Sequence, residues 1–174
     1  MASDVESASL VRRIRVALVL FIIALVLSGV TAFPLLWELS LIGKILGVDP
    51  AEPALYGDGL RFWIALVWRG LQDTYAEYPF IAYGTDWLAF AHLMIALFFL
   101  PVYRDPQRYR GNLLCGIAAC VLVIPLALIC GPIREIPFYW RLIDCSFGIV
   151  GIIPLLYALR LTDRLPPFSV ALRQ

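Results

Sequence analysis

The stretch VALVLFIIALVLSGVTAFPLLW, residues 16–37, contains no charged side chain. A helix needs about 20 mainly apolar residues to cross about 30 Å of hydrocarbon, so this stretch predicts a membrane span. Three further apolar stretches are bounded by charged residues and lie at 87–103, 111–133 and about 142–159, and Asp144 is the one charged side chain within them. Together they predict an all-α polytopic membrane protein with four transmembrane helices.

Composition agrees with a chain that is solvated by lipid. Hydrophobic residues make up 61% of the 174 residues and the mean hydropathy is +0.84, whereas soluble proteins are roughly 45–50% apolar. The length suits a single integral membrane domain, residues 1–174, with one sizeable loop. The net charge is +1 and the basic residues are not interleaved with aromatic platforms, so no nucleic acid is expected. The expected partners are membrane lipids and a second copy or another membrane protein.

Arginines collect at alternating ends of the four stretches. Because cytoplasmic loops carry an excess of basic residues, their positions predict that both termini are cytoplasmic in an inner, cytoplasmic membrane. Residues 38–86 and 132–141 then face outward. A secretory signal peptide is the competing interpretation of the first stretch, but the stretch is long for one and lacks a terminal Ala-x-Ala. The basic residues on the predicted cytoplasmic side are Arg12, Arg13, Arg15, Arg104, Arg108, Arg110, Arg160, Arg164 and Arg173.

The long outer segment contains a second helical signal, at about 59–78. Its apolar residues recur at helical spacing and its charged residues fall mostly elsewhere, which predicts an amphipathic helix on the outer surface. The helix either packs as a cap or covers a pocket, and the pattern leaves both open. A shorter apolar run, residues 39–46, follows Pro34 and is expected to continue the first helix after a kink. The apolar residues of the amphipathic helix are Leu60, Trp63, Ile64, Val67, Leu71, Tyr75 and Tyr78.

His92 is the single histidine, and it lies inside the second predicted span. It shares a helical face with Ala89 and Ala96, whose small side chains leave room for a neighbouring helix or a ligand. An interhelical hydrogen bond and a role in proton transfer or ligand binding both remain open. Asp86 lies about 120° round the helix, so no Asp–His couple is expected. With one histidine in the chain, we predict no metal site, and no cofactor is identified.

Asp144 lies near the outer end of the fourth span, on the same face as Gly148 and Gly151. Small residues mark a packed face, so Asp144 is expected to face the bundle, with Arg141 as a potential ion-pair partner. His92 and Asp144 are the candidate catalytic residues. The topology brings six ionisable groups to the outer level, which suit an anionic headgroup, a quinone carbonyl or a small acid. These candidate ligand-binding residues are Asp86, His92, Arg134, Glu135, Arg141 and Asp144.

The four cysteines form no C-x-x-C pair. Cys130 and Cys145 lie at similar distances from the outer turn, so a disulfide between them is geometrically conceivable, although buried free thiols are common. A thiol oxidoreductase is not favoured.

Two functions from different classes fit these patterns. The first is a four-helix binding or structural subunit that assembles with itself or with other membrane proteins. The alternative is a small membrane enzyme or carrier with an outward-facing pocket that uses His92, Asp144 and Arg141. The chain has no nucleotide-binding loop, zincin motif or nucleophile elbow. Small multidrug transporters also have four helices but depend on an acidic residue in the first span, which is uncharged here.

Overall fold

The computed structural model describes residues 2–166, all of whose regular structure is helical. Seven α-helices and two short 3-10 helices follow one another along this part of the chain. Arg173, one of the predicted cytoplasmic arginines, lies outside the described residues. The elements are α1 (Ala2–Ala32), α2 (Leu35–Leu46), η1 (Pro53–Tyr56), α3 (Leu60–Glu77), η2 (Pro79–Ile81), α4 (Ala82–Phe98), α5 (Leu100–Arg104), α6 (Arg110–Ile133) and α7 (Phe138–Thr162).

Four helical segments are long and apolar enough to cross a membrane. They are Val5–Ala32, Pro79–Arg104, Arg110–Ile133 and Phe138–Thr162. Each contains most of one predicted span, and the helices extend past the predicted limits because charged side chains do not stop a helix. The first span differs most, since α1 ends at Ala32 and the separate helix α2 begins after Pro34, which supplies no backbone N–H.

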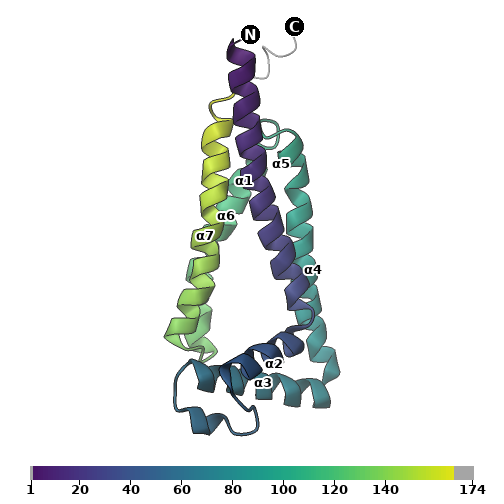
Figure 1. The fold of residues 1–174 in the computed structure, drawn as a ribbon, viewed down its shortest axis with the longest axis vertical. Coiled ribbons are helices and arrows are strands. Elements are labelled where there is room, and N and C mark those ends of the chain that lie inside the picture. The colour runs from purple at the N-terminus through teal and green to yellow at the C-terminus, as the bar shows by residue number, and fades with distance from the viewer. Residues whose placement is uncertain (1, 167–174) are drawn as a thin grey trace. The chain divides into compact units, whose positions relative to one another are not determined.

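The described residues form two compact units, and each is described here by itself. Unit 1 contains residues 2–24 and 96–166, and unit 2 contains residues 25–95. In unit 1, α6 and α7 form an antiparallel hairpin and lie side by side (Figure 1). The core of this unit contains five large side chains with almost no exposed surface, namely Ile14, Leu18, Val102, Leu113 and Leu155.

The α6–α7 hairpin is closely packed at Gly148. A Cβ atom built at this glycine would overlap the carbonyl oxygen of Cys120, which belongs to the backbone of α6. Gly148, Leu155 and Ala158 are all buried on this face of α7, in agreement with the predicted packed face. Backbones that approach this closely are typical of helix pairs in membranes.

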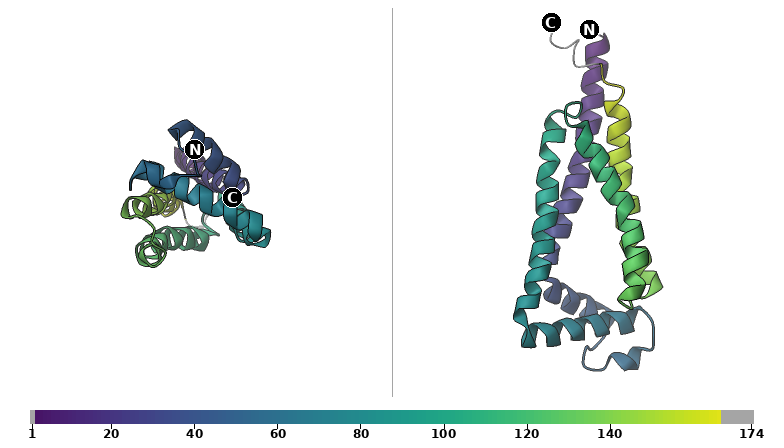
Figure 2. Two further views of the ribbon diagram at one scale, coloured as in Figure 1. Left: turned by 90° about the horizontal axis from the view of Figure 1, so that it is seen from below. Right: turned by 180° about the vertical axis from the view of Figure 1, so that it is seen from behind.

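Unit 2 contains α2 and α3, which pack side by side (Figure 2). The indole of Trp68 lies against Gly43, where a Cβ atom would be 2.5 Å from Cζ3. Gly47 ends α2 in the left-handed conformation, with φ 64°, and its carbonyl oxygen accepts a hydrogen bond of 2.8 Å from Arg61. The contact of Trp68 with Gly43 and the hydrogen bond from Arg61 to Gly47 therefore hold α2 and α3 together.

The buried face of α3 differs from the predicted apolar face. Ile64, Ala65 and Trp68 are its buried residues, whereas Leu60 and Tyr78 are about half exposed. The difference arises because Gly43 leaves space for a large indole, which draws Trp68 into the contact with α2. A helix is therefore present where one was predicted.

Candidate functional site

The six predicted ligand-binding residues divide between the two units. Asp86 and His92 lie on α4 in unit 2, and the other four lie around the α6–α7 turn in unit 1. Two separate clusters therefore have to be considered, each with its own chemistry.

His92 packs where α4 meets the end of α1. A Cβ atom at Gly29 of α1 would lie 3.1 Å from His92 Cβ and 2.9 Å from the carbonyl oxygen of Ala89. The room left by Ala89 is thus taken by a neighbouring helix, one of the two occupants that the sequence left open. Gly29 was not singled out from the sequence, and its place in the middle of a uniformly apolar run explains why.

The imidazole of His92 forms a hydrogen bond within its own helix and not the interhelical bond that was one expectation. Nδ1 lies 2.8 Å from the carbonyl oxygen of Leu88, four residues earlier. A carbonyl oxygen only accepts, so Nδ1 carries the proton and donates, which leaves Nε2 with the lone pair in the neutral ring. Nε2 is the atom available to accept a proton or to bind a ligand. His92 is half-buried.

Asp86 is half-buried near the start of α4. It makes no hydrogen bond or ion pair with His92 among the described residues, as the helical period predicts. Three aromatic residues lie within four positions of it on the helix. The rings of Tyr83 and Trp87 lie 5.9 Å apart, and those of Trp87 and Phe90 also lie 5.9 Å apart. Exposed aromatic residues near a span end are typical of the headgroup level of a membrane.

The end of α6 positions Arg134 and Glu135. Ile136 N–H donates to the carbonyl of Gly131 and Glu135 N–H donates to that of Pro132, which is the hydrogen-bond pattern of a Schellman cap. Glu135 occupies the left-handed position of this cap with φ 57°, the one residue other than glycine with a positive φ in the described chain. Glycine normally fills this position, so glutamate there carries backbone strain.

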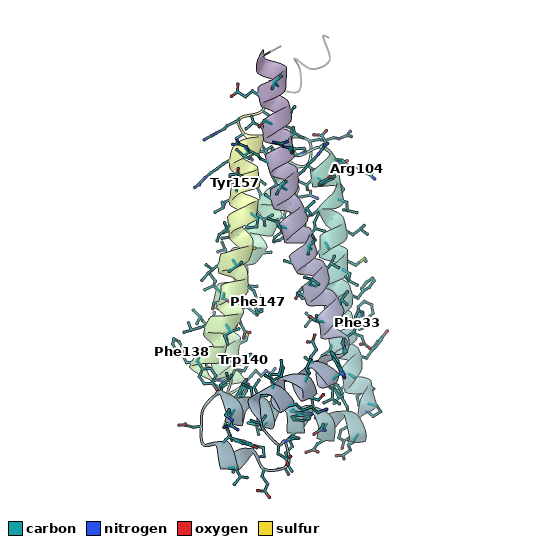
Figure 3. The ribbon with its side chains drawn as sticks, in the orientation of Figure 1. Phe33, Arg104, Phe138, Trp140, Phe147 and Tyr157 are labelled. Carbon is teal, nitrogen blue, oxygen red and sulfur yellow. The ribbon has the colours of Figure 1, made fainter. Side chains whose placement is uncertain are left out.

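Arg141 lies across the α6–α7 hairpin. The methylene groups of its side chain cover Gly131 of α6, and its guanidinium carbon is 5.2 Å from the ring centroid of Phe138. Its Nε is buried and has no hydrogen-bond partner among the described residues. Figure 3 shows Phe138 and Trp140 at the same end of α7.

Asp144 is half-buried one turn after Arg141 on α7. The expected ion pair between them is not formed, since no contact of 4.0 Å or less joins them among the described side chains. The physical reason lies in the packing of Arg141, whose side chain is directed across Gly131 and Phe138. Arg134, Glu135, Arg141 and Asp144 therefore share one end of the hairpin without forming a closed ion-pair network.

The cysteines are free thiols in the structure. Cys145 is buried and its Sγ lies 4.0 Å from the carbonyl oxygen of Ile124, whereas Cys130 is exposed. The conceivable Cys130–Cys145 disulfide is thus not present, because the two side chains are directed to different surroundings.

A cavity that was not predicted from the sequence lies at the end of unit 1 opposite the α6–α7 turn. It has a volume of about 490 Å³ and is formed by the loop between α5 and α6 and by the end of α7. Arg110 and Asp163 form a salt bridge in its wall, with Nε 2.8 Å from Oδ1. Its lining residues are Gln107, Arg108, Arg110, Thr162, Asp163 and Leu165. A signal existed in the basic α5–α6 loop, but we interpreted those arginines only as markers of topology.

Within residues 2–166, no three histidine, cysteine or acidic side chains are grouped closely enough to hold a metal ion. Comparison of the chain with known protein families, with curated proteins and with solved structures gives no match. Residues 2–166 form a helical structure with four helices that are long and apolar enough to cross a membrane.

Proposed function

We propose that this protein is an integral membrane subunit that assembles with a second copy of itself or with another membrane protein through α6. The observation that carries the proposal is the exposure of this helix. In the most apolar window of α6 only 6% of the residues are buried, against 22% or more in the other three candidate spans. A helix that contributes so little surface to its own bundle is available to a partner helix.

The open face of α6 has the spacing of a helix–helix interface. Six of its exposed residues recur at intervals of four and three, the repeat that keeps one seam against a partner helix. Small residues at one end allow a close approach of two backbones, and the branched residues that follow supply packing. The residues of this face are Cys115, Ala119, Leu122, Leu126, Ile129 and Ile133.

The expected orientation belongs to the same proposal. The arginines at the ends of the spans favour cytoplasmic termini in an inner membrane. Residues 38–86, including α3, then lie on the outer side. The exposed ion pair between Arg69 and Asp73, 3.6 Å apart, and the exposed apolar side chains of Leu60 and Leu66 suit a helix that lies at the membrane surface.

Cysteine cross-linking in native membranes tests the α6 interface. Cys115 lies on the proposed face and is exposed, whereas Cys145 is buried inside the hairpin. A short bismaleimide is expected to join two chains through Cys115 and to give a product of twice the monomer mass. Cys115→Ser should remove this product, and Cys145→Ser serves as the matched control that should retain it. A cross-linked product of another mass would identify a different partner. The proposal fails if no product depends on Cys115.

A second candidate function is supported by the end of the α6–α7 hairpin. The unpartnered Nε of Arg141 and the strained backbone of Glu135 are the kind of features that accumulate at ligand sites. In this alternative, Arg141 binds an anionic or carbonyl group and Asp144 lies beside it. His92 belongs to the other unit and would act separately, through Nε2.

The second candidate is tested by comparing Arg141→Lys with Arg141→Gln in native mass spectra of protein extracted gently from its membrane. A bound small molecule in the wild type that is lost in both variants, with the fold retained, would favour the pocket. Equal spectra for all three proteins would exclude it.

A further inference from the structure

The cavity between the α5–α6 loop and the end of α7 has an unusual charge distribution. Arg110 donates to Asp163 through Nε at 2.8 Å and through Nη2 at 3.3 Å, so that its charge is balanced while three of its five N–H groups remain available. Arg108 has no carboxylate partner among the described residues. Within residues 2–166, Asp105 makes no ion pair with the Arg108 side chain, and its Oδ1 accepts a hydrogen bond of 3.0 Å from the backbone N–H of Arg108.

Other polar groups in the cavity wall are already engaged. The Thr162 hydroxyl donates to the carbonyl of Ala158 at 2.8 Å, and the Gln107 amide donates to the carbonyl of Pro166, also at 2.8 Å. The guanidinium of Arg108, 5.8 Å from the ring centroid of Tyr109, and the remaining N–H groups of Arg110 are therefore the donors left to meet a ligand. Donors of this kind in a fork geometry suit phosphate oxygens.

The surroundings add positive potential to the cavity. Three further arginines of unit 1 lie near the ends of α5 and α7 and are exposed: Arg104, Arg160 and Arg164. Figure 3 labels Arg104 at the end of α5. Arg15 of α1 reaches the same end of α5, since its Nε donates to the carbonyl of Tyr103 at 3.2 Å. An anion is attracted here, and a zwitterionic group with a terminal cation is disfavoured.

From the ends of the candidate spans, we expect the cavity at the depth of lipid headgroups. Arg110 is the first residue of one candidate span and Thr162 is the last residue of another. Directly beyond them, the hairpin exposes Leu114 and Tyr157, which provide an apolar surface for acyl chains. A volume of about 490 Å³ is within the usual range for small-molecule sites, roughly 300–1,000 Å³.

We propose that this cavity binds the headgroup of an anionic phospholipid, with Arg108 and Arg110 on its phosphate and the acyl chains along α6 and α7. The site uses none of the residues named for the α6 interface and goes beyond the proposed subunit function. It requires only that the arginine-rich end of unit 1 meets the membrane–water boundary.

The test uses the full chain in a non-ionic detergent and native mass spectrometry to measure dissociation constants. Three probes are titrated: dioctanoyl phosphatidylglycerol, dioctanoyl phosphatidylcholine and inorganic phosphate. The wild type is expected to bind phosphatidylglycerol most tightly. Arg108→Gln should weaken this binding about fivefold, the effect of one basic residue at a membrane surface. Arg12→Gln, which removes the same charge outside the cavity, is the matched control and should change the constant by about twofold or less.

Asp163→Asn is a second variant, and it should change the affinity for phosphatidylglycerol in the opposite direction to Arg108→Gln. It removes a negative charge and releases Arg110, so the affinity for phosphatidylglycerol should rise even though the hairpin loses an ion pair. A merely structural role for these residues would lower stability in this variant without tightening lipid binding. The proposal is overturned if phosphatidylcholine or inorganic phosphate binds as tightly as phosphatidylglycerol. It is equally overturned if Arg108→Gln and Arg12→Gln have the same effect.

Discussion

Replacement of Gly148 by alanine tests the close packing of the α6–α7 hairpin. In an uncrowded helix this change would stabilise the protein by about 1 kcal/mol, because alanine has the better helix propensity. Here the new Cβ would overlap the carbonyl oxygen of Cys120, a backbone atom that cannot rotate away. Overpacking costs up to about 3 kcal/mol. The expected net effect of Gly148→Ala is therefore a loss of about 2 kcal/mol in the free energy of unfolding.

The measurement is reversible unfolding in mixed micelles, followed by helical circular dichroism. Gly111→Ala is the matched control on the same hairpin, because a Cβ atom there meets nothing within 4 Å. The control should leave the free energy of unfolding unchanged or raise it slightly. If Gly148→Ala proved as stable as Gly111→Ala, the described approach of α6 and α7 would be wrong.

Three further predictions concern the turn, unit 2 and pH. Gly43→Ala should speed hydrogen exchange in α2, since its Cβ would be 2.6 Å from Trp68 Cε3. Gly70→Ala is the control and should leave the exchange rate in α2 unchanged, because a Cβ there meets nothing within 4 Å. Equal exchange rates in the two variants would contradict the contact between Gly43 and Trp68. Glu135→Gly should raise the free energy of unfolding by about 1 kcal/mol by relieving the left-handed strain, and a loss would count against the cap. A hydrogen bond from Arg110 holds the pKa of Asp163 below its ordinary value of 3.8. The resulting stability is present above about pH 4 and is lost as the pH falls through the lowered pKa. The difference in melting temperature between wild type and Asp163→Asn should therefore shrink as the pH falls into the acid range, and a difference that stays constant as the pH falls would refute the pairing.

Much of the fold follows from hydrophobic length and charge. The apolar runs at 111–133 and 142–159 lie within α6 and α7, because transfer into lipid favours a helix in an apolar run between charges. Helix ends were harder to predict. Arginines 12, 13 and 15 end the apolar run but favour helix, so α1 continues to Ala2.

The candidate site was predicted less well, because spacing along one helix does not reveal the neighbour. The small-residue face of His92 left a neighbouring helix or a ligand open, and Gly29 of α1 lies against it. The hydrogen bond to Leu88 depends on a rotamer that the sequence does not specify. Arg141 was expected to meet Asp144, its neighbour in sequence. It lies against Gly131 instead, a residue on another helix. The cavity also depends on long-range pairing, since Arg110 and Asp163 are 53 residues apart.

The most direct test of the subunit proposal is the mass of the particle that contains this chain in its own membrane. Native membranes solubilised into polymer discs, without detergent exchange, allow native mass spectrometry of the assembled state. The proposal predicts a particle of two copies of the 19.5 kDa chain, or of one copy with a second membrane protein in fixed ratio. A particle that holds a single copy and no other protein, across the full range of expression levels, would contradict it.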